Sequence, residues 1–157
     1  MKNLRTTAVC VSILFYSLCT SAQNAAIPIN EPDYNKPVLF SNLPDKIPVS
    51  MNDISSLFAT PVGREINLSL SAQNNLQFTG EVISSVNKYA NSMQSVVIRS
   101  SNYNGARFTV SKVIATDGTV TYTGRIISFQ HGDLFELQKL NNELVLVKRN
   151  FYDLVNE

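Results

Sequence analysis

The sequence predicts a mainly β protein: an antiparallel up-and-down meander of about seven strands, curled into a partly closed barrel and preceded by one short helix. From Arg64 onward apolar residues recur at every second position, which is the period of a strand with one buried face. Short turn-forming segments separate these runs, and connections this short join only antiparallel neighbours. A long meander has open edges, and curling into a barrel reduces their exposure.

The first 22 residues predict a secretory signal peptide. Lys2 and Arg5 precede an apolar stretch from about Ala8 to Leu18, and small residues lead to a cleavage site after Ala22. This stretch is shorter than the roughly 20 residues that span a bilayer, and no later segment approaches that length, so no membrane span is expected in the mature chain. The expected location is secreted, periplasmic or cell-surface. A lipid anchor at Cys19 is the competing interpretation, and the bulky Leu18 before it disfavours it.

Removing the signal changes the charge and the cysteine content. Lys and Arg fall from 13 to 11 against 12 Asp and Glu, so the mature chain is close to neutral and slightly acidic. The only adjacent basic pair is Lys148-Arg149, which argues against a nucleic-acid partner. Both cysteines, Cys10 and Cys19, lie in the signal, so we expect neither a disulfide nor a thiolate metal site.

Three segments follow the signal. Residues 23–48 hold five prolines and read as a flexible leader to about residue 37, then as an extended apolar arm from Val38 to Ile47 that packs on the domain. The single small β domain is expected over 49–157. It begins with a helix near residues 50–58, because Ser50 and Asp53 form a capping pair and Pro61 and Gly63 end the apolar helical face.

Seven strands are expected after the helix, and each shows alternation or an apolar run: EINLSLSA (65–72), LQFTGEV (76–82), MQSVVIRSS (93–101), RFTVSKVIAT (107–116), TVTYTGRIISFQ (119–130), LFELQKL (134–140) and ELVLVKRN (143–150). Asp117-Gly118 predicts a two-residue turn with both residues at positive φ. Val120 and Tyr122 before Gly124 alternate in one phase, and Ile127 and Phe129 after it alternate in the other. This apparent slip at Gly124 predicts a bulge or bend. The predicted buried face comprises Ile66, Leu68, Leu70, Leu76, Phe78, Val82, Val96, Ile98, Phe108, Val110, Ile126, Phe135, Leu137, Leu144 and Leu146.

The only histidine, His131, lies with Gly132 and Asp133 in a short connection, where we interpret it as an exposed hairpin corner rather than a catalytic group. No nucleophile-elbow pattern accompanies it, so a hydrolase centred on His131 is the least favoured function. One histidine without cysteine, and no calcium-loop spacing, predict no metal site and no cofactor.

Successive turns of a meander fall at alternating ends, so the turns at 73–75, 102–105 and 131–133 are expected to gather at one end. They would bring together an aromatic ring and several donors and acceptors, a combination suited to a sugar or a peptide. The candidate ligand-binding residues are Asn102, Tyr103, Asn104, Arg107, His131 and Asp133. These residues predict a non-enzymatic binding module whose partner is a protein or a glycan.

A second hypothesis comes from a resemblance. The runs FTGEV (78–82), SVVIRSS (95–101) and GRIISFQHGDLFEL (124–137) resemble the strand pattern of the β-rich prodomains of secreted reprolysin-type zinc metalloproteases. The resemblance implies a propeptide-like or inhibitor-like module that binds a secreted protease.

Overall fold

The computed structural model describes residues 35–71 and 76–154. The chain divides into two compact units, Met1–Pro32 and Asp33–Glu157, and the described residues belong to the second. The expected signal peptide, its cleavage site after Ala22, the leader up to residue 34 and the turn at 73–75 lie outside the described residues.

The described residues form one antiparallel sheet of eight strands, in the order β1-β8-β7-β6-β5-β4-β3-β2. The strands are β1 (Lys46–Val49), β2 (Glu65–Ser71), β3 (Leu76–Lys88), β4 (Met93–Ser100), β5 (Arg107–Ile114), β6 (Val120–Ile127), β7 (Asp133–Leu140) and β8 (Glu143–Asn150). Two helical segments accompany them, α2 (Met51–Leu57) and the 3-10 helix η2 (Phe151–Leu154). The predicted fold class is therefore confirmed, with one strand more than expected.

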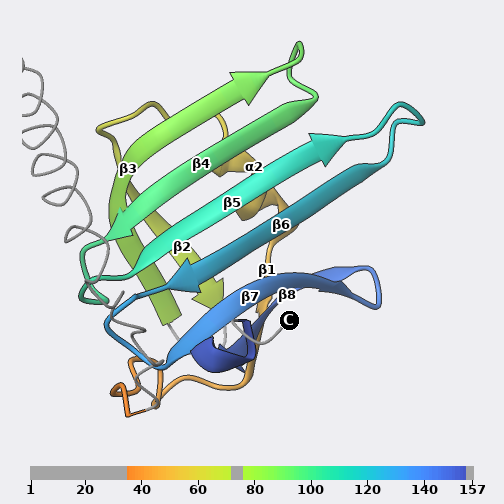
Figure 1. The fold of residues 1–157 in the computed structure, drawn as a ribbon. Helices are drawn as coiled ribbons and strands as arrows, with labels where there is room; N and C mark the ends of the chain where they lie inside the picture. Colours follow the sequence, from red (N-terminus) through yellow and green to blue (C-terminus); the bar gives the residue numbers. More distant parts are fainter. Residues whose placement is uncertain (1–34, 72–75, 155–157) are drawn as a thin grey trace, which may run out of the picture. The chain divides into compact units, whose positions relative to one another are not determined.

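The sheet curls into a half-barrel. Strands β3 to β6 lie side by side on one wall, whereas β7 and β8 turn away from β6 (Figure 1). The sheet ends at β1 and β2, whose Cα atoms approach within 8 Å although no hydrogen-bonded ladder joins them. The eighth strand, β1, comes from the predicted apolar arm and pairs with β8 through Ile47 and Leu146.

The core lies on the inner face of the sheet, as the alternation predicts. Of the fifteen predicted core residues, all but two are buried: Ile66 is half-buried, and the side chain of Leu76 lies outside the described residues. The arm adds Phe40, Ile47 and Val49 to the same core, because it folds back onto the barrel.

Helix α2 confirms the predicted capping pair and packs on the inner face. The Asp53 N–H donates to Ser50 Oγ at 3.4 Å, and Ile54 and Leu57 are buried. The hydroxyls of Ser55 and Tyr122 are hydrogen-bonded at 3.0 Å, so the helix is tied to β6 across the core. In Figure 1 the helix lies behind β4 and β5.

The bulge predicted at Gly124 is wrong. The register between β5 and β6 is continuous through Gly124. Val120, Tyr122, Gly124 and Ile126 are therefore in step with one another on the inner face of the sheet. A Cβ at Gly124 would lie 2.7 Å from the carbonyl oxygen of Thr109, so the close approach of β5 requires glycine. The bulges lie instead in β2–β3 near Ser69 and in β3–β4 near Val82.

The predicted turn at Asp117-Gly118 is also wrong in type. Only Gly118 has a positive φ, and Ala115 and Thr119 close a longer loop. Two consecutive residues at positive φ occur at Asn141 and Asn142, between the paired residues Leu140 and Glu143. Asparagine tolerates this region because its short polar side chain bonds locally.

Candidate functional site

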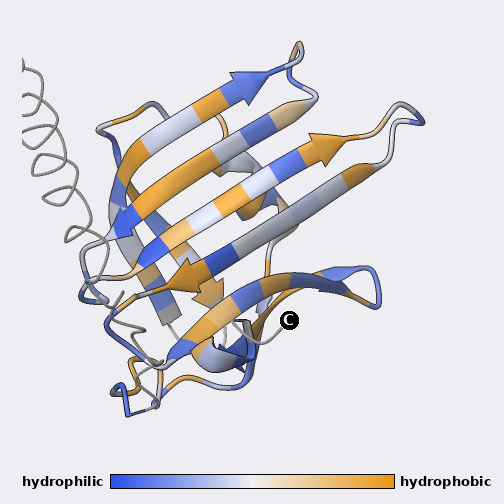
Figure 2. Cartoon of the chain, in the orientation of Figure 1, coloured by the Kyte–Doolittle hydropathy of each residue, from blue (hydrophilic) through white to orange (hydrophobic). Residues whose placement is uncertain are grey.

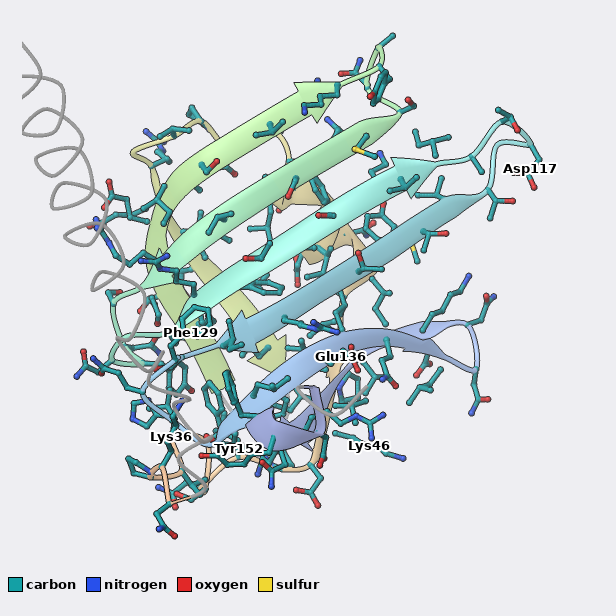
Figure 3. All side chains as sticks on the ribbon, viewed as in Figure 1. Lys36, Lys46, Asp117, Phe129, Glu136 and Tyr152 are labelled. Carbon is teal, nitrogen blue, oxygen red and sulfur yellow. The ribbon has the colours of Figure 1, made fainter. Side chains whose placement is uncertain are left out.

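The loops of the predicted ligand-binding cluster do meet at one end of the barrel. A Cβ at Gly105, in the β4–β5 loop, would lie 3.1 Å from Ser128 Oγ, in the β6–β7 loop. Figure 3 places Phe129 and Lys36 at this end and Asp117 at the far end of the β5–β6 hairpin. The alternation of turns therefore predicted that these two loops are neighbours, whereas the third predicted turn, 73–75, lies outside the described residues.

Asp133 is buried at this end, where it fixes the arm. Its two carboxylate oxygens accept the backbone N–H groups of Leu39 and Phe40, each at 2.7 Å, and only 6% of the residue is exposed. The neighbouring Gly132 N–H donates to the carbonyl of Pro37 at 2.9 Å. We call this set of bonds the arm clasp. Because Asp133 is almost fully buried and each of its oxygens already accepts a backbone N–H, its carboxylate serves the fold.

Asn102 and Tyr103 are likewise used within the fold. Asn102 Oδ1 accepts the Thr79 N–H at 3.1 Å, and its Nδ2 donates to the Gln77 carbonyl at 2.7 Å. The Tyr103 ring packs against Phe40 and Phe78, with centroids 5.4 and 6.0 Å away. Burial raises the pKa of the Tyr103 hydroxyl above its ordinary value. Tyr103 closes this end of the core rather than forming a free aromatic platform.

His131 is half-buried rather than mostly exposed, and it has a serine partner. Its Nδ1 lies 2.8 Å from Ser128 Oγ, and Ser128 is 0% exposed. No carboxylate among the described residues bonds to the other ring nitrogen. A buried hydroxyl three residues from its histidine stabilises the turn, and a substrate carbonyl cannot approach it, so this pair lacks the geometry of a nucleophile and base.

Asn102, Asn104 and Arg107 are the exposed members of the cluster, and of these Asn102 is already bonded to Thr79 and Gln77. Arg107 lies on the outer face of the sheet directly across from Arg99, which forms a 2.7 Å ion pair with Glu81. Four of the six predicted residues therefore serve the fold, and the remaining two do not share a pocket with them. A ligand site at this end would have to compete with these internal bonds.

The other end of the barrel shows a different surface. Five of the nine exposed large hydrophobic side chains in the described residues lie near the tips of the β3–β4 and β5–β6 hairpins. Val120 is in step with the inner-face residues of β6, and the other four are Val86, Tyr89, Met93 and Val113. We call these four residues the hairpin-tip surface. Met93 pairs directly with Val113 across the ladder, and Lys88, two residues after Val86, pairs with Met93. Figure 2 shows hydrophobic residues near the ends of β3 and β5.

Tyr89 is held at the hairpin tip by a strained backbone. Tyr89, Ala90 and Asn91 have φ values of 53°, 51° and 75°, in the left-handed region. The loop is closed by the Ser92 N–H and the Ser92 hydroxyl, which donate to the Tyr89 carbonyl at 3.1 and 2.8 Å. A left-handed conformation costs an L-residue roughly 1–2 kcal/mol, and glycine avoids that cost. The tip nevertheless carries a tyrosine that is 75% exposed.

A network of charged groups links β6, β7 and β8. Glu136 on β7 bonds Arg125 on β6 at 3.1 Å and lies 3.8 Å from Arg149 on β8. Burial would raise the pKa of Glu136, but hydrogen bonds from Gln138 and Arg125 and the charges of both arginines hold it below 4.5. The ladder between β6 and β7 has only four residue pairs, and this network adds side-chain bonds that link β6 and β8 to β7.

Neither a metal site nor a membrane helix is found in the part of the chain that the structure describes. No group of three or more His, Cys, Asp or Glu is placed to hold a metal ion there. Among the same residues no helix is long and apolar enough to cross a bilayer.

No family model, no curated protein and no solved structure matches this chain.

Two signals in the sequence pointed to the hairpin-tip surface. Met93 and Val113 are apolar residues out of phase with the buried alternation of their strands, so they fall on the outer face. Val86 is in phase with Phe78 and Val82, and it reaches the outer face only because the bulge after Val82 shifts the register. The turn KYANS contains no glycine although its backbone needs positive φ at three positions. The second signal becomes apparent only when the loop length is known, because the sequence alone leaves the turn type open.

Proposed function

We propose that this protein is a non-enzymatic binding module that recognises another protein through the hairpin-tip surface. The observation that carries the proposal is the exposed Tyr89 on a strained tip beside Val86, Met93 and Val113. Tyrosine supplies a large contact area at low cost in conformational entropy, and it is enriched among the residues that dominate binding energy.

The chemistry of this surface favours a protein over a glycan. Three of its four side chains are aliphatic or thioether groups, which pack against apolar side chains. The outer face below it carries hydroxyls, and the Ser111 and Ser95 hydroxyls are bonded to each other at 3.0 Å. Sugar recognition uses polar groups placed beside an aromatic ring, and the amides nearest Tyr89, those of Asn87 and Asn91, are hydrogen-bonded to each other.

The test compares two exposed aromatic residues at opposite ends of the barrel. Proteins from the medium of the source cells are captured on the immobilised chain, on the Tyr89→Ala/Val113→Thr variant and on the Phe129→Ala variant, and each bound protein is quantified. Phe129 is 68% exposed, so it is a matched control for Tyr89. We expect a partner that the first variant loses at least tenfold and that the control retains. A partner retained by both variants, or lost with Phe129→Ala, would contradict the proposal.

A second candidate function is that of an inhibitor-like or propeptide-like module that binds a secreted protease. The protruding Tyr89 hairpin favours it, because a convex strained loop fits a concave cleft. The measurement is the activity of co-secreted proteases with and without the chain. Inhibition that disappears with Tyr89→Ala and persists with Phe129→Ala would support this function over simple binding.

A further inference from the structure

Strands β4, β5 and β6 form a wall whose charged side chains are all basic. Their sequences, MQSVVIRS, RFTVSKVI and VTYTGRII, contain four basic residues and no aspartate or glutamate. Residues 23–157 as a whole are slightly acidic, so this positive charge is a local concentration. Three of the basic residues are arginines on the outer face, namely Arg99, Arg107 and Arg125. Figure 1 shows this face toward the reader, with α2 behind the wall.

Arg107 lies at the centre of the three arginines. It pairs directly with Arg99 on β4, and Arg125 on β6 is opposite Thr109, the next residue of β5 on the same face. Like charges directly opposite each other in a sheet are destabilising, and diagonal neighbours are within reach of long side chains. The sheet therefore holds Arg107 between two other cations, at a cost in stability.

The acids that pair with the two flanking arginines lie on the far sides of the wall. Arg99 is paired with Glu81 on β3 at 2.7 Å, and Arg125 is paired with Glu136 on β7 at 3.1 Å. In the order of the sheet, neither β3 nor β7 is next to β5. Within the part of the chain that the structure describes, no ion pair includes Arg107. An exposed guanidinium among cations, without an acid of its own, is suited to bind an anion from outside.

A hollow in the same face adjoins the arginines. It measures about 360 Å³, within the range of roughly 300–1,000 Å³ that is typical of ligand pockets. Its outer-face lining consists of Thr109, Ser111, Thr123, Arg125 and Glu136. Thr109 is two positions after Arg107 on the same face, so Arg107 lies beside the hollow. Among the described residues the hydroxyls of Thr109 and Thr123 have no hydrogen-bond partner, whereas that of Ser111 is bonded to Ser95.

The lining of the hollow indicates the class of ligand. Free hydroxyls, a guanidinium and a carboxylate together can bind the hydroxyl groups of a sugar, and a charged sugar can be anchored by an arginine instead of an aromatic ring. An acidic peptide fits this face less well. A bound peptide uses an open strand edge or pockets for its side chains, and both edges of β4 and of β5 are paired.

We infer that the outer face of β4–β6 binds an acidic saccharide, with the carboxylate or sulfate group of the sugar on Arg107 and the sugar ring in the hollow. Thr109 and Thr123 bond the ring hydroxyls, and Arg99 adds positive potential from the adjacent strand. The site shares no residue with the hairpin-tip surface, so either one can fail without the other.

The experiment measures the affinity of residues 23–157 for four labelled probes of matched length by fluorescence anisotropy. The probes are oligogalacturonate, which carries carboxylates, sulfated dextran oligomers, neutral dextran oligomers and oligo-glutamate. We expect at least one acidic saccharide to bind about tenfold or more tightly than neutral dextran and oligo-glutamate. The acidic saccharide that binds more tightly identifies the preferred anion as a carboxylate or a sulfate.

The charge of the site is tested with two arginine variants. Arg107→Gln should weaken the acidic saccharide by about tenfold or more, because the sugar's anion loses its bidentate partner. The control is Arg64→Gln, which removes an exposed arginine outside the wall and should leave the affinity within about twofold. Arg107→Gln should not lower the thermal midpoint, because it relieves the repulsion with Arg99.

The hollow is tested with threonine variants that keep the shape of the side chain. Thr109→Val/Thr123→Val should weaken the acidic saccharide by about threefold or more, because two hydrogen bonds to the ring are lost. The control is Thr121→Val, since Thr121 is on the same face of β6 and does not line the hollow. Its affinity should match that of the parent.

Three outcomes would overturn the inference. The first is that neither acidic saccharide binds more tightly than neutral dextran. The second is equal weakening by Arg107→Gln and Arg64→Gln, which would mean non-specific attraction to the whole chain. The third is oligo-glutamate that binds as tightly as the better saccharide and is unaffected by Thr109→Val/Thr123→Val, because an acidic protein segment would then be the ligand.

Discussion

The backbone at Tyr89, Ala90 and Asn91 makes a prediction at the scale of single residues. Ala90→Gly should increase the free energy of unfolding by about 0.5–1 kcal/mol. Glycine removes the cost of the left-handed conformation, and the higher conformational entropy of glycine in the unfolded chain offsets part of that gain. Urea unfolding measures the change. Ala115→Gly is the matched control, since Ala115 lies in an exposed loop without positive φ. It should destabilise slightly, and a gain equal to that of Ala90→Gly would refute the strain.

The Ser128–His131 contact changes what the sequence predicts for His131. As an exposed corner, His131→Asn would cost within roughly half a kcal/mol. Because Ser128 is fully buried and bonded to Nδ1, His131→Ala should instead cost about 1–3 kcal/mol by leaving the hydroxyl without its partner. In the double variant with Ser128→Ala much of that cost should disappear. A cycle of thermal unfolding measurements gives the coupling, and additive effects would mean that the bond contributes nothing.

At the scale of elements, the arm depends on Asp133. Asp133→Ala removes the acceptor of two 2.7 Å bonds and should cost at least about 2 kcal/mol. Hydrogen exchange should accelerate at Leu39 and Phe40 well before it does in β4 and β5. The control is Glu81→Ala, which removes an exposed ion pair with Arg99 and should cost less than about 1 kcal/mol. Equal exchange at the arm and in the sheet would argue against a separable clasp.

The ladder between β6 and β7 predicts a pH dependence through Glu136. Its pKa is lower in the folded chain than its ordinary value of 4.5, so the stabilisation is fully present above 4.5 and is lost as the pH falls through the folded pKa. Glu136→Gln should therefore flatten the loss of stability below pH 4.5 relative to the parent. Thermal midpoints measured across this range test it, and parallel curves for the two proteins would contradict it.

Periodicity predicted the elements well where burial decides the structure. Alternation identified the inner face, including Phe78, Ile98 and Phe108, because a one-residue slip would expose the whole strand. The apparent slip at Gly124 was misleading because Phe129 belongs to the following turn and not to β6. The turn at Asp117-Gly118 differed because loop length depends on pairing across the hairpin, which a dipeptide does not specify.

The candidate site was harder to predict than the fold, for a physical reason. Asn102, Tyr103 and Asp133 are polar or aromatic turn residues, and such side chains serve equally to satisfy a buried backbone or to bind a ligand. Which role they take depends on the arm, whose Leu39 and Phe40 amides reach Asp133 across 93 or 94 positions of sequence. No local pattern contains that contact.

At the scale of the whole molecule, the proposed hairpin-tip surface makes a prediction about salt. Its exposed side chains are mostly apolar, so binding to it should depend little on screening. Raising the salt from about 0.05 to about 0.5 M should therefore leave the affinity for the Tyr89-dependent partner within about threefold. Titration calorimetry at both concentrations measures the affinity. A loss of more than about tenfold would show that charge dominates the binding.

The arm clasp has a consequence for how the chain acquires its structure during synthesis. Residues 36–49 leave the ribosome before the strands with which they pair. Their side-chain bonds reach Phe129, Asp133 and strand β8, which follow them by 93 to 105 positions in the sequence. The β3–β6 hairpins can pair locally as they emerge, but the arm must wait until the chain is almost complete. This high contact order favours slow final closure and a long-lived intermediate with an open barrel. In such an intermediate Phe40 is outside the core, so this end of the core should stay open to solvent until the arm docks.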